Sequence, residues 1–332
     1  MSGPRCVDAE GSHREIGRTV GEAFKEDIRR ILGELEIGKY STEAHREVVE
    51  AQNRILKDIY PGLCEEMEGI AEGAGVEPYD IFAYNYLPEM WRVGGCSAFA
   101  FEAPGGAIFG KTNDIGENKE HYHVPIRYTL PGGRRMLVFT WPGTVWVNAV
   151  VTEEGLVKVG ASAPAVPPRK DGLCSNVAGR VLVERAEGPE DVLGLLLRIP
   201  ISGHPPNFVV GDERGFFAVE YSTYEYAVRK PEDGMVAVTN HFVSLSGPEP
   251  PEERLANSRA RYENLLRLVP QGPRTPERAM EILRDHSEPG AICQHGQAGM
   301  HTSVAYVVVP SERAIYFAYG KPCTVPFQRY EL

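Results

Sequence analysis

The sequence predicts an α+β protein in which helices pack on the outside of β-sheets. Helical periodicity dominates the chain up to about residue 95, and short runs rich in Val, Phe, Tyr and Ala dominate the rest. Two pairs of helical stretches interrupt the later runs, and a hairpin follows the second pair. Alternating blocks of strands and helices favour layered sheets with helices outside.

Four helices are predicted in the N-terminal part. Ser12 can cap the first, because apolar residues recur three or four positions apart after it. The others are predicted at about residues 42–58, at residues 65–75, where a glycine ends the helix, and at about residues 78–91. Taken alone, this part is expected to be a helical cover over a sheet.

Short apolar runs bounded by Gly, Pro or Asp predict the strands. The runs are AFAFEA, AIFGKT, MLVFTW, VWVNAVV, LVKVGAS, NFVVGD, FFAVEYS, MVAVTN, SVAYVVVP and AIYFAYG. Turn residues between paired runs predict hairpins. Those turns are EAPGGA, LPGGRR, GDERG and PSERA.

Two helix pairs are predicted among the strands. Thr275 is the expected N-cap of the last helix, because a proline that suits the first turn follows it. Residues 241–254 are rich in proline and glutamate, which cannot build a core, and are predicted to form a mobile loop. The pairs span residues 175–186 with 188–199 and residues 258–269 with 275–286.

Composition excludes several classes of function. The 332 residues carry a formal net charge of −11, whereas nucleic-acid and anionic-membrane surfaces need clustered Lys and Arg. No run of about 18 apolar residues could span a membrane, and the start has no signal-peptide pattern. We therefore expect a cytoplasmic protein that binds neither nucleic acid nor membrane, and homo-oligomers stay open. The six dispersed cysteines are expected to be reduced thiols.

Cys96 differs from the other cysteines in its context. It follows Gly94 and Gly95 at the point where helical periodicity gives way to strands. Glycines beside a cysteine would permit the strained backbone of an N-to-S acyl shift across the Gly95–Cys96 bond. Hydrolysis would then free the α-amino group of Cys96, whose pKa of about 7.7–8.0 suits it to accept the thiol proton. The alternative is that Cys96 is a small buried hydrophobic residue.

Several segments of the chain resemble one known family. YPGLCEEMEGIAEGAGV is the most specific segment, and GGCSAFAF matches a self-cleavage junction. The others are GSHREIGRTVGEAF, FGKTNDIG, NFVVGDERGFFAVE, VTNHF, NSRARY and ICQHG with TSVAYVVVPSERAIYFAYGKPC. In this order they resemble the isopenicillin N acyltransferase family, the cysteine N-terminal-nucleophile (Ntn) amidohydrolases of peptidase family C45. The resemblance runs through nearly the whole chain.

The resemblance implies a four-layer αββα sandwich. Residues 1–95 would form a helical N-terminal fragment or propeptide, and residues 96–332 the catalytic fragment, together one domain. Cys96 would be the nucleophile, released by cleavage of the bond before it. Asp114 would accept a hydrogen bond from the new amino group, and Asn240 would donate its side-chain amide to the oxyanion of the tetrahedral intermediate.

The resemblance singles out three further positions. Relatives in the bile salt hydrolase branch have an arginine where this chain has Lys111. A lysine keeps the charge that favours a thiolate but lacks the bidentate fork of arginine. Arg259 resembles a family arginine near the nucleophile, and Arg261 is nearly as good a candidate. Thr152 stands where that branch has the asparagine of an N-E-x-G-L motif, which contributes to the oxyanion hole.

Histidines and cysteines offer two competing ligand sets for a metal. His121 and His123 would share one face of a strand, and Cys293, His295 and His301 lie close together in the sequence. Neither set has a second convincing cluster, and ICQHG belongs to the C-terminal segment of the family. We therefore predict no metal and no cofactor. Papain-like and dinucleotide-binding motifs are also missing.

The sequence thus predicts a self-processing amidohydrolase. Cys96 would attack the carbonyl of a small N-acyl amide and form a thioester. The acyl group would then pass to water, or to an amine in an acyl-transfer variant. The alternatives are an acyl-CoA-dependent N-acyltransferase, an uncleaved inactive scaffold of the same fold and a metal-dependent hydrolase. The identity of the small-molecule substrate does not follow from the sequence.

Overall fold

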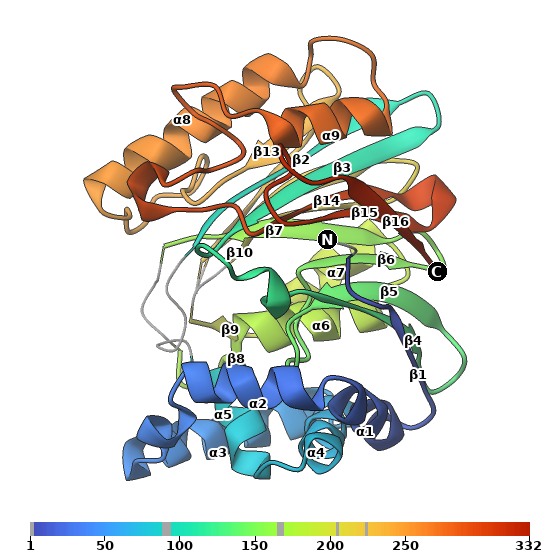
Figure 1. The fold of residues 1–332 in the computed structure, drawn as a ribbon, viewed down its shortest axis with the longest axis vertical. Coiled ribbons are helices and arrows are strands. Elements are labelled where there is room, and N and C mark those ends of the chain that lie inside the picture. The colour runs from blue at the N-terminus through green and yellow to red at the C-terminus, as the bar shows by residue number, and fades with distance from the viewer. Residues whose placement is uncertain (1–2, 88–93, 165–168, 204–205, 223–224) are drawn as a thin grey trace.

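Two large sheets organise the protein. The computed structural model describes residues 3–87, 94–164, 169–203, 206–222 and 225–332, and helices cover the outer face of each sheet (Figure 1). In spatial order, the eight-stranded sheet contains β1 (Val7–Glu10), β4 (Val124–Thr129), β5 (Arg135–Thr140), β6 (Ala149–Thr152), β7 (Val157–Ser162), β10 (Pro206–Gly211), β11 (Phe216–Tyr221) and β12 (Tyr226–Arg229). The six-stranded sheet contains β13 (Met235–Val238), β2 (Gly95–Ala103), β3 (Gly106–Asp114), β14 (Val304–Val309), β15 (Ala314–Tyr319) and β16 (Phe327–Glu331). A short parallel pair is formed by β8 (Leu173–Cys174) and β9 (Ile201–Ser202).

The helices fall into three groups along the chain. Those before β2 are α1 (His13–Ala23), α2 (Lys25–Glu34), α3 (Glu43–Ile59), α4 (Gly62–Ala74) and α5 (Pro78–Tyr86). After β8 come α6 (Ser175–Arg185) and α7 (Pro189–Leu196), and between β13 and β14 come α8 (Glu252–Leu268) and α9 (Pro276–Arg284). None of the helices in the described residues combines the length and apolar character needed to cross a membrane.

Three apolar cores separate four layers. The core between the sheets contains inward-facing residues such as Phe139 of β5 and Phe109 of β3. The outer face of the eight-stranded sheet packs against α1, α4, α5 and α6, and that of the six-stranded sheet against α8 and α9. Strands buried on both faces become nearly continuous apolar runs, which is why they could be predicted. The predicted α+β class and αββα arrangement are confirmed.

Most predicted elements are present, including the hairpins. The first predicted helix is divided at Phe24, and the last part of the fourth lies outside the described residues. Only the second half of VWVNAVV forms a strand. The sequence does not predict β1, β4, β12 and β16. Three of these are edge strands whose exposed polar residues interrupt any apolar run.

Glycines allow α1 and α4 to pack backbone against backbone. A Cβ atom at Gly17 would lie 2.0 Å from the carbonyl oxygen of Glu66, and one at Gly69 would lie 2.2 Å from that of Arg14. Such approaches exclude every residue except glycine. The spaced glycines of GSHREIGRTVGEAF and EEMEGIAEGAG therefore have a structural role, which is to bring the two helices together.

A buried charged group, here named the interface cluster, joins α1, α4 and α6. It consists of His13, Glu66, Arg180 and Glu184. Arg180 donates to Glu184 at 2.7 Å and to Glu66 at 3.2 Å, and His13 lies 3.3 Å from each carboxylate. The first two residues precede residue 95 and the last two follow it, so the cluster links the two predicted fragments.

Candidate active site

Cys96 lies at the start of β2, where several polar side chains converge. In the antiparallel pairing of β2 with β3, Gly95 lies opposite Asp114. The backbone N–H of Cys96 donates to Oδ1 of Asn240 at 2.8 Å. All three predicted residues, Cys96, Asp114 and Asn240, are buried here. The structure therefore brings together residues that the sequence separates widely.

Arg261 of α8 extends into the same cluster and is only 1% exposed. Its guanidinium donates to the backbone carbonyl of Cys96 at 2.6 Å and to the hydroxyl of Ser97 at 2.9 Å. It also donates to Oδ1 of Asn240 at 2.8 Å. Burial lowers the pKa of Arg261, although the charge of Asp114 opposes this effect. Arg261 thus holds the backbone of Cys96 and the side chain of Asn240 in one arrangement.

Arg259 does not lie at this cluster, so the expectation that placed it beside the nucleophile is corrected. Its side chain is 56% exposed and pairs with Glu249 at the surface. Residues two apart on a helix point to opposite sides of it. The buried Ser258 and Leu265 mark the inward face of α8, and Arg261 belongs to that face. This spacing is the sequence signal that distinguishes the two arginines.

Asp114 ends β3 and is fully buried. Its carboxylate accepts hydrogen bonds from the hydroxyl of Thr302 at 2.7 Å and from that of Thr112 at 3.4 Å. Burial raises the pKa of Asp114 to about 6, although Arg261 and both hydroxyls favour the charged form. The carboxyl group therefore changes its charge close to neutral pH.

Gly94 and Gly95 are needed for close packing against Asp114. A Cβ atom at Gly94 would lie 2.7 Å from the backbone carbonyl oxygen of Asp114. One at Gly95 would lie 3.3 Å from the carboxylate of Asp114 and 3.1 Å from Met300. The φ of Gly95 is outside the left-handed region. Space, rather than the strained backbone expected from the sequence, accounts for glycine at this position.

The side-chain amide of Asn240 is held at both ends. Its oxygen accepts from Cys96 and Arg261, and its Nδ2 donates to the carbonyl of Ser162 at 2.9 Å. This set of partners fixes the orientation of the amide, and one of the two Nδ2 hydrogens is not used by the bond to Ser162. In the uncut chain Asn240, rather than Asp114, holds the nitrogen of Cys96.

Lys111 brings a buried positive charge close to the thiol. Its ammonium donates to the backbone carbonyl of Gly160 on β7 at 2.6 Å, and burial lowers the pKa of Lys111. Burial also raises the pKa of the Cys96 thiol, whereas the charges of Lys111 and Arg261 and a hydrogen bond from the Asp114 backbone act in the opposite direction. The thiol is therefore mostly protonated at neutral pH and needs a base before it can attack.

Two cavities meet at the segment before Cys96. The proline cavity lies on the α8 side and is bounded by Asn240, Arg261 and the loop of residues 248–251. The lysine cavity lies on the other side and is bounded by Cys96, Lys111, Lys158 and one face of α6. Gly94 lines both cavities. Removal of the residues before Cys96 would therefore join them.

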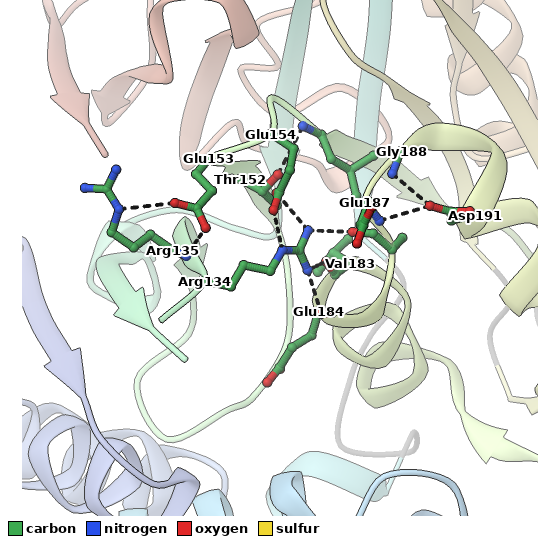
Figure 2. Close-up of polar contacts among 12 residues, drawn as sticks. Arg134, Arg135, Thr152, Glu153, Glu154, Val183, Glu184, Glu187, Gly188 and Asp191 are labelled. Atoms are coloured by element: carbon green, nitrogen blue, oxygen red, sulfur yellow. Dashed lines mark hydrogen bonds and ion pairs between the residues drawn. The ribbon is translucent and has the colours of Figure 1, made fainter. Parts of the chain in front are cut away.

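Thr152 does not lie at the site, and the expectation from the N-E-x-G-L motif is corrected. Thr152 ends β6 at the turn into β7. Figure 2 shows it beside Glu154, whose partner Arg134 also donates to carbonyls at the C-terminal end of α6. Ser162, which contacts the cluster, is at the far end of β7. The whole length of a strand therefore separates Thr152 from Cys96.

His121 and His123 have different partners. Nε2 of His121 lies 3.2 Å from the carboxylate of Glu34, and Nδ1 of His123 lies 2.8 Å from the hydroxyl of Tyr306. Although the sequence suggested a shared face, the short 3-10 helix of residues 120–122 turns the chain between them. The two rings do not form the suggested ligand pair.

Sequence reasoning missed three residues that support the cluster. The hydroxyl of Ser258 accepts the backbone N–H of Asn240 at 2.8 Å. Sδ of Met300 accepts the N–H of Gly95 at 3.0 Å, and Thr302 donates to the Asp114 carboxylate. Ser258 and Thr302 lie in the segments NSRARY and TSVAYVVVP that carry the family resemblance, but only tertiary packing shows that they contact this cluster.

The fold and the site together define a class of protein. A four-layer αββα sandwich with a buried cysteine at the start of an inner strand is the arrangement of cysteine Ntn hydrolases. Residues 103–323 match the family described as "Acyl-coenzyme A:6-aminopenicillanic acid acyl-transferase", and the chain belongs to that family. The matched segment begins just after Cys96 and contains Asp114, Asn240 and Arg261. The predicted type of enzyme, an amide C–N hydrolase or acyltransferase, is confirmed.

Individual relatives are distant. The chain is 23% identical over 317 residues to the 40 kDa form of acyl-coenzyme A:6-aminopenicillanic-acid-acyltransferase from Emericella nidulans, which covers 88% of this chain and 85% of that protein. It is 25% identical over 138 residues to the β-alanyl-dopamine/carcinine hydrolase of Drosophila melanogaster, 36% of each. A solved N-acylethanolamine-hydrolyzing acid amidase ortholog from Caenorhabditis elegans is 12% identical with a TM-score of 0.49, covering 65% of this chain and 93% of that one. A solved variant of the conjugated bile acid hydrolase from Clostridium perfringens is 11% identical with a TM-score of 0.45, covering 71% of this chain and 97% of that one.

Proposed function

We propose that this protein cleaves its own Gly95–Cys96 bond and then uses Cys96 as the nucleophile of an amidase or acyltransferase. The observation that carries this proposal is the convergence of Asp114, Asn240 and Arg261 on that one peptide bond. They come from β3, from the loop after β13 and from α8, and all are buried. A purely structural cysteine needs no such set of charged and amide groups.

Self-processing requires only groups of this chain and water. The Cys96 thiol attacks the carbonyl carbon of Gly95, the carbon–nitrogen bond breaks, and the nitrogen of Cys96 gains the thiol proton. Water then hydrolyses the thioester, which leaves a carboxylic acid on Gly95 and a free thiol and amine on Cys96. Departure of Gly95 brings the new amine next to the carboxylate of Asp114, which favours its ammonium form.

The same groups then serve the reaction with an amide substrate. The amine of Cys96 accepts the thiol proton, the thiolate attacks the carbonyl, and the departing amine of the substrate carries the proton away. The remaining Nδ2 hydrogen of Asn240 is the proposed donor to the oxyanion, and Lys111 and Arg261 favour the thiolate. Arg259 has no proposed part. Cytoplasmic location and homo-oligomerisation stay predictions.

Intact-mass measurement and a denaturing gel test the processing step. The wild-type protein should separate into residues 1–95 and 96–332, with Cys96 as a new N-terminus. Cys96→Ala should remain one chain and lose all activity on N-acyl amides. Cys174→Ala, which removes another largely buried thiol, is the matched control and should process normally.

An uncut wild-type protein that hydrolyses amides would refute the α-amino group of Cys96 as the base. An uncut protein without activity would support the alternative of an inactive scaffold. The relatives include both an acyltransferase and a hydrolase. A panel of N-acyl amides, assayed with and without an added amine or an acyl-CoA donor, should show which acceptor the thioester prefers. Release of free acid in the absence of any amine identifies a hydrolase.

A further inference from the structure

Two cysteines and two histidines meet beyond the end of β15, away from Cys96. Sγ of Cys293 lies 3.6 Å from Sγ of Cys323 and 3.5 Å from Nε2 of His295. The same nitrogen lies 3.2 Å from Sγ of Cys323. His286 brings a ring nitrogen within 4.8 Å of the ligand atoms of His295 and Cys323. We propose that these four residues bind a zinc ion.

The separations of the ligand atoms support this assignment. Zinc–sulfur bonds of about 2.3 Å and zinc–nitrogen bonds of about 2.0 Å in a tetrahedron place two sulfurs about 3.8 Å apart and a sulfur and a nitrogen about 3.6 Å apart. The three separations among Cys293, His295 and Cys323 are within a few tenths of an ångström of these values. His286 lies within 4.8 Å of His295 and Cys323 but not of Cys293, so its side chain would move inward to complete the tetrahedron. Two thiolates with two imidazoles form a ligand set that selects zinc.

The hydrogen bond of His286 leaves its other ring nitrogen available to a metal ion. Nδ1 of His286 lies 3.0 Å from the backbone carbonyl of Arg284, which can only accept, so this nitrogen carries the proton. Nε2 then has a free lone pair, which is the arrangement usual for a metal-binding histidine.

The two cysteines must lose protons when the ion binds. Zinc displaces two thiol protons to solvent and forms a centre with two thiolates, two neutral imidazoles and no net charge. No electron is transferred in this step.

The proposed ion would stabilise the loop that supports the candidate active site. Cys293 and His295 begin a hairpin in which Gln294 and Thr302 exchange hydrogen bonds, and Thr302 donates to Asp114. His301, which the sequence suggested as a ligand, instead lies 3.8 Å from Glu117. The proposed site thus contains His286 and Cys323 in place of His301, and it departs from the sequence-based prediction of no metal.

Cobalt(II) binding to the reduced, chelator-treated full chain tests the site, because tetrahedral cobalt with thiolate ligands has a distinct absorption spectrum. We expect one equivalent to bind and zinc to displace it. Cys323→Ser should abolish the spectrum. His286→Ala, a change at an exposed residue that leaves folding intact, should weaken binding by more than the about 10–100-fold that loss of a supporting group costs.

Cys6→Ser and His301→Ala are the matched controls and should bind cobalt like the wild type. Failure of the wild type to bind cobalt or zinc would overturn the proposal. Retention of the spectrum in Cys323→Ser would do the same. A mass two hydrogens lower after purification in the presence of zinc would show that Cys293 and Cys323 form a disulfide instead, which also refutes the site.

A separate observation concerns the lysine cavity, and the inference from it rests on the proposed function. Lys158 of β7 is 7% exposed, and its ammonium lies 5.2 Å from the centre of the Phe208 ring. Within the described part of the chain, no residue accepts a hydrogen bond from it. Burial, together with the charge of Lys111, lowers the pKa of Lys158 to about 7. The fold thus places an amine, without a hydrogen-bond acceptor in the described residues, beside a cavity, where an anion would favour its charged form.

The surrounding wall is suited to an anion. Nδ2 of Asn148 is buried without an acceptor, and no Asp or Glu lines the cavity among the described residues. Asn176 of the first turn of α6 also faces the cavity, where the helix dipole adds partial positive charge. We infer that Lys158 and Asn148 bind a carboxylate of the substrate. The preferred substrates would then be N-acyl amides that carry a carboxylate, such as N-acyl amino acids.

Tryptophan fluorescence can measure this preference, because Trp141 and Trp146 line the cavity. The processed enzyme is titrated with an N-acyl amino acid and with its neutral carboxamide. We expect the wild type to bind the carboxylate at least about tenfold more tightly, since a charged hydrogen bond to a buried group contributes about 1.5–3 kcal/mol. Lys158→Met should bring the ratio close to one. Lys57→Met, at an exposed position on α3, should leave it unchanged.

Equal binding of both compounds to the wild type would overturn the carboxylate subsite, as would a preference that survives in Lys158→Met. Hydrolysis of an uncharged N-acyl amide, measured in parallel, reports on Cys96 alone. Hydrolysis without a carboxylate preference therefore refutes the subsite, whereas a preference in binding without any hydrolysis refutes the proposed function.

Discussion

Two buried arginines show how differently this protein treats charge. Arg180 in the interface cluster contacts two carboxylates directly, and although burial opposes it, Glu66 and Glu184 raise the pKa of Arg180. Arg261 at Cys96 contacts only neutral oxygens, and burial lowers its pKa. Both side chains are almost completely excluded from solvent.

The different partners of Arg180 and Arg261 distinguish charges that stabilise the fold from charges that can take part in a reaction. Charges that neutralise one another, as in the interface cluster, hold helices together and leave nothing to react. At the site Lys111 and Arg261 bind carbonyl, hydroxyl or amide oxygens, and Asp114 binds hydroxyls. Charges held in this way remain available to a thiolate, an ammonium or a substrate.

Removal of Arg180 should have the largest effect on stability. Arg180→Met leaves Glu66 and Glu184 buried without their partner, and loss of one member of a buried ion pair costs about 3–5 kcal/mol. Urea unfolding in the Cys96→Ala background, where the chain stays whole, measures this cost. Arg14→Met, which breaks half-exposed ion pairs with Glu68 and Glu72, should cost about 1 kcal/mol or less. Equal losses of unfolding free energy in Arg180→Met and Arg14→Met would contradict the stabilising role of the interface cluster.

Arg261 should matter for chemistry and Arg259 should not. Arg261→Met removes the donors to Cys96 and Asn240, and loss of a donor of this type costs on the order of 10²–10³ in rate. A time course of self-processing measures the change. Arg259→Met should process within about twofold of the wild type, because surface ion pairs contribute little. Slow processing in both variants would contradict the assignment of Arg261.

The pH dependence of self-processing should report Asp114. Its carboxyl group, with a pKa of about 6 in the uncut chain, is charged above that pH and neutral below it. We expect the charged carboxylate to accept the thiol proton during self-processing, so the rate should fall about tenfold per pH unit below 6, and deprotonation of the thiol should raise it further at alkaline pH. Asp114→Asn should lack the inflection near 6 and process slowly throughout. An unchanged inflection in that variant would assign it to another group.

The smallest expected effect concerns His13. Although burial opposes the charge, Glu66 and Glu184 raise the pKa of His13 above its ordinary 6.5. The folded protein therefore binds this proton more tightly than the unfolded chain. The stability that protonated His13 contributes is complete below pH 6.5. It is lost as the pH rises through the higher pKa that His13 has in the folded protein. Unfolding free energies of Cys96→Ala should show this decline, and His13→Gln should flatten it.

Much of the fold could be predicted because its signals are local. Strands buried on both faces are continuous apolar runs, and Ser12, Gly75 and Thr275 stand at helix ends as expected. Edge strands such as β1 and β16 could not be found, since exposed polar residues interrupt their apolar pattern.

The site was harder to predict because it depends on tertiary packing. Cys96 could be identified from its glycines and from the family, but the contacts of Met300 and Thr302 depend on how the hairpin after Cys293 packs. Lys158 alternates with valines along β7, a pattern typical of a solvent-facing residue, yet it lies beside α6. The prediction that Arg259 lies beside the nucleophile was wrong, because the buried residues of α8 place Arg261 on its inward face and Arg259 on its exposed face.

The pairing of β1 with β4 has a consequence for the lifetime of the mature enzyme. Val7–Glu10 pair with residues 126–129, and with the interface cluster they would keep the two fragments joined after the cut. The precursor folds as one molecule, at a rate independent of concentration. Two separated fragments would have to find each other again by diffusion, and the helical fragment would meet solvent with its apolar faces uncovered. Each molecule would thus fold only once, before the cut, and the rate of unfolding would set the active lifetime of the processed enzyme.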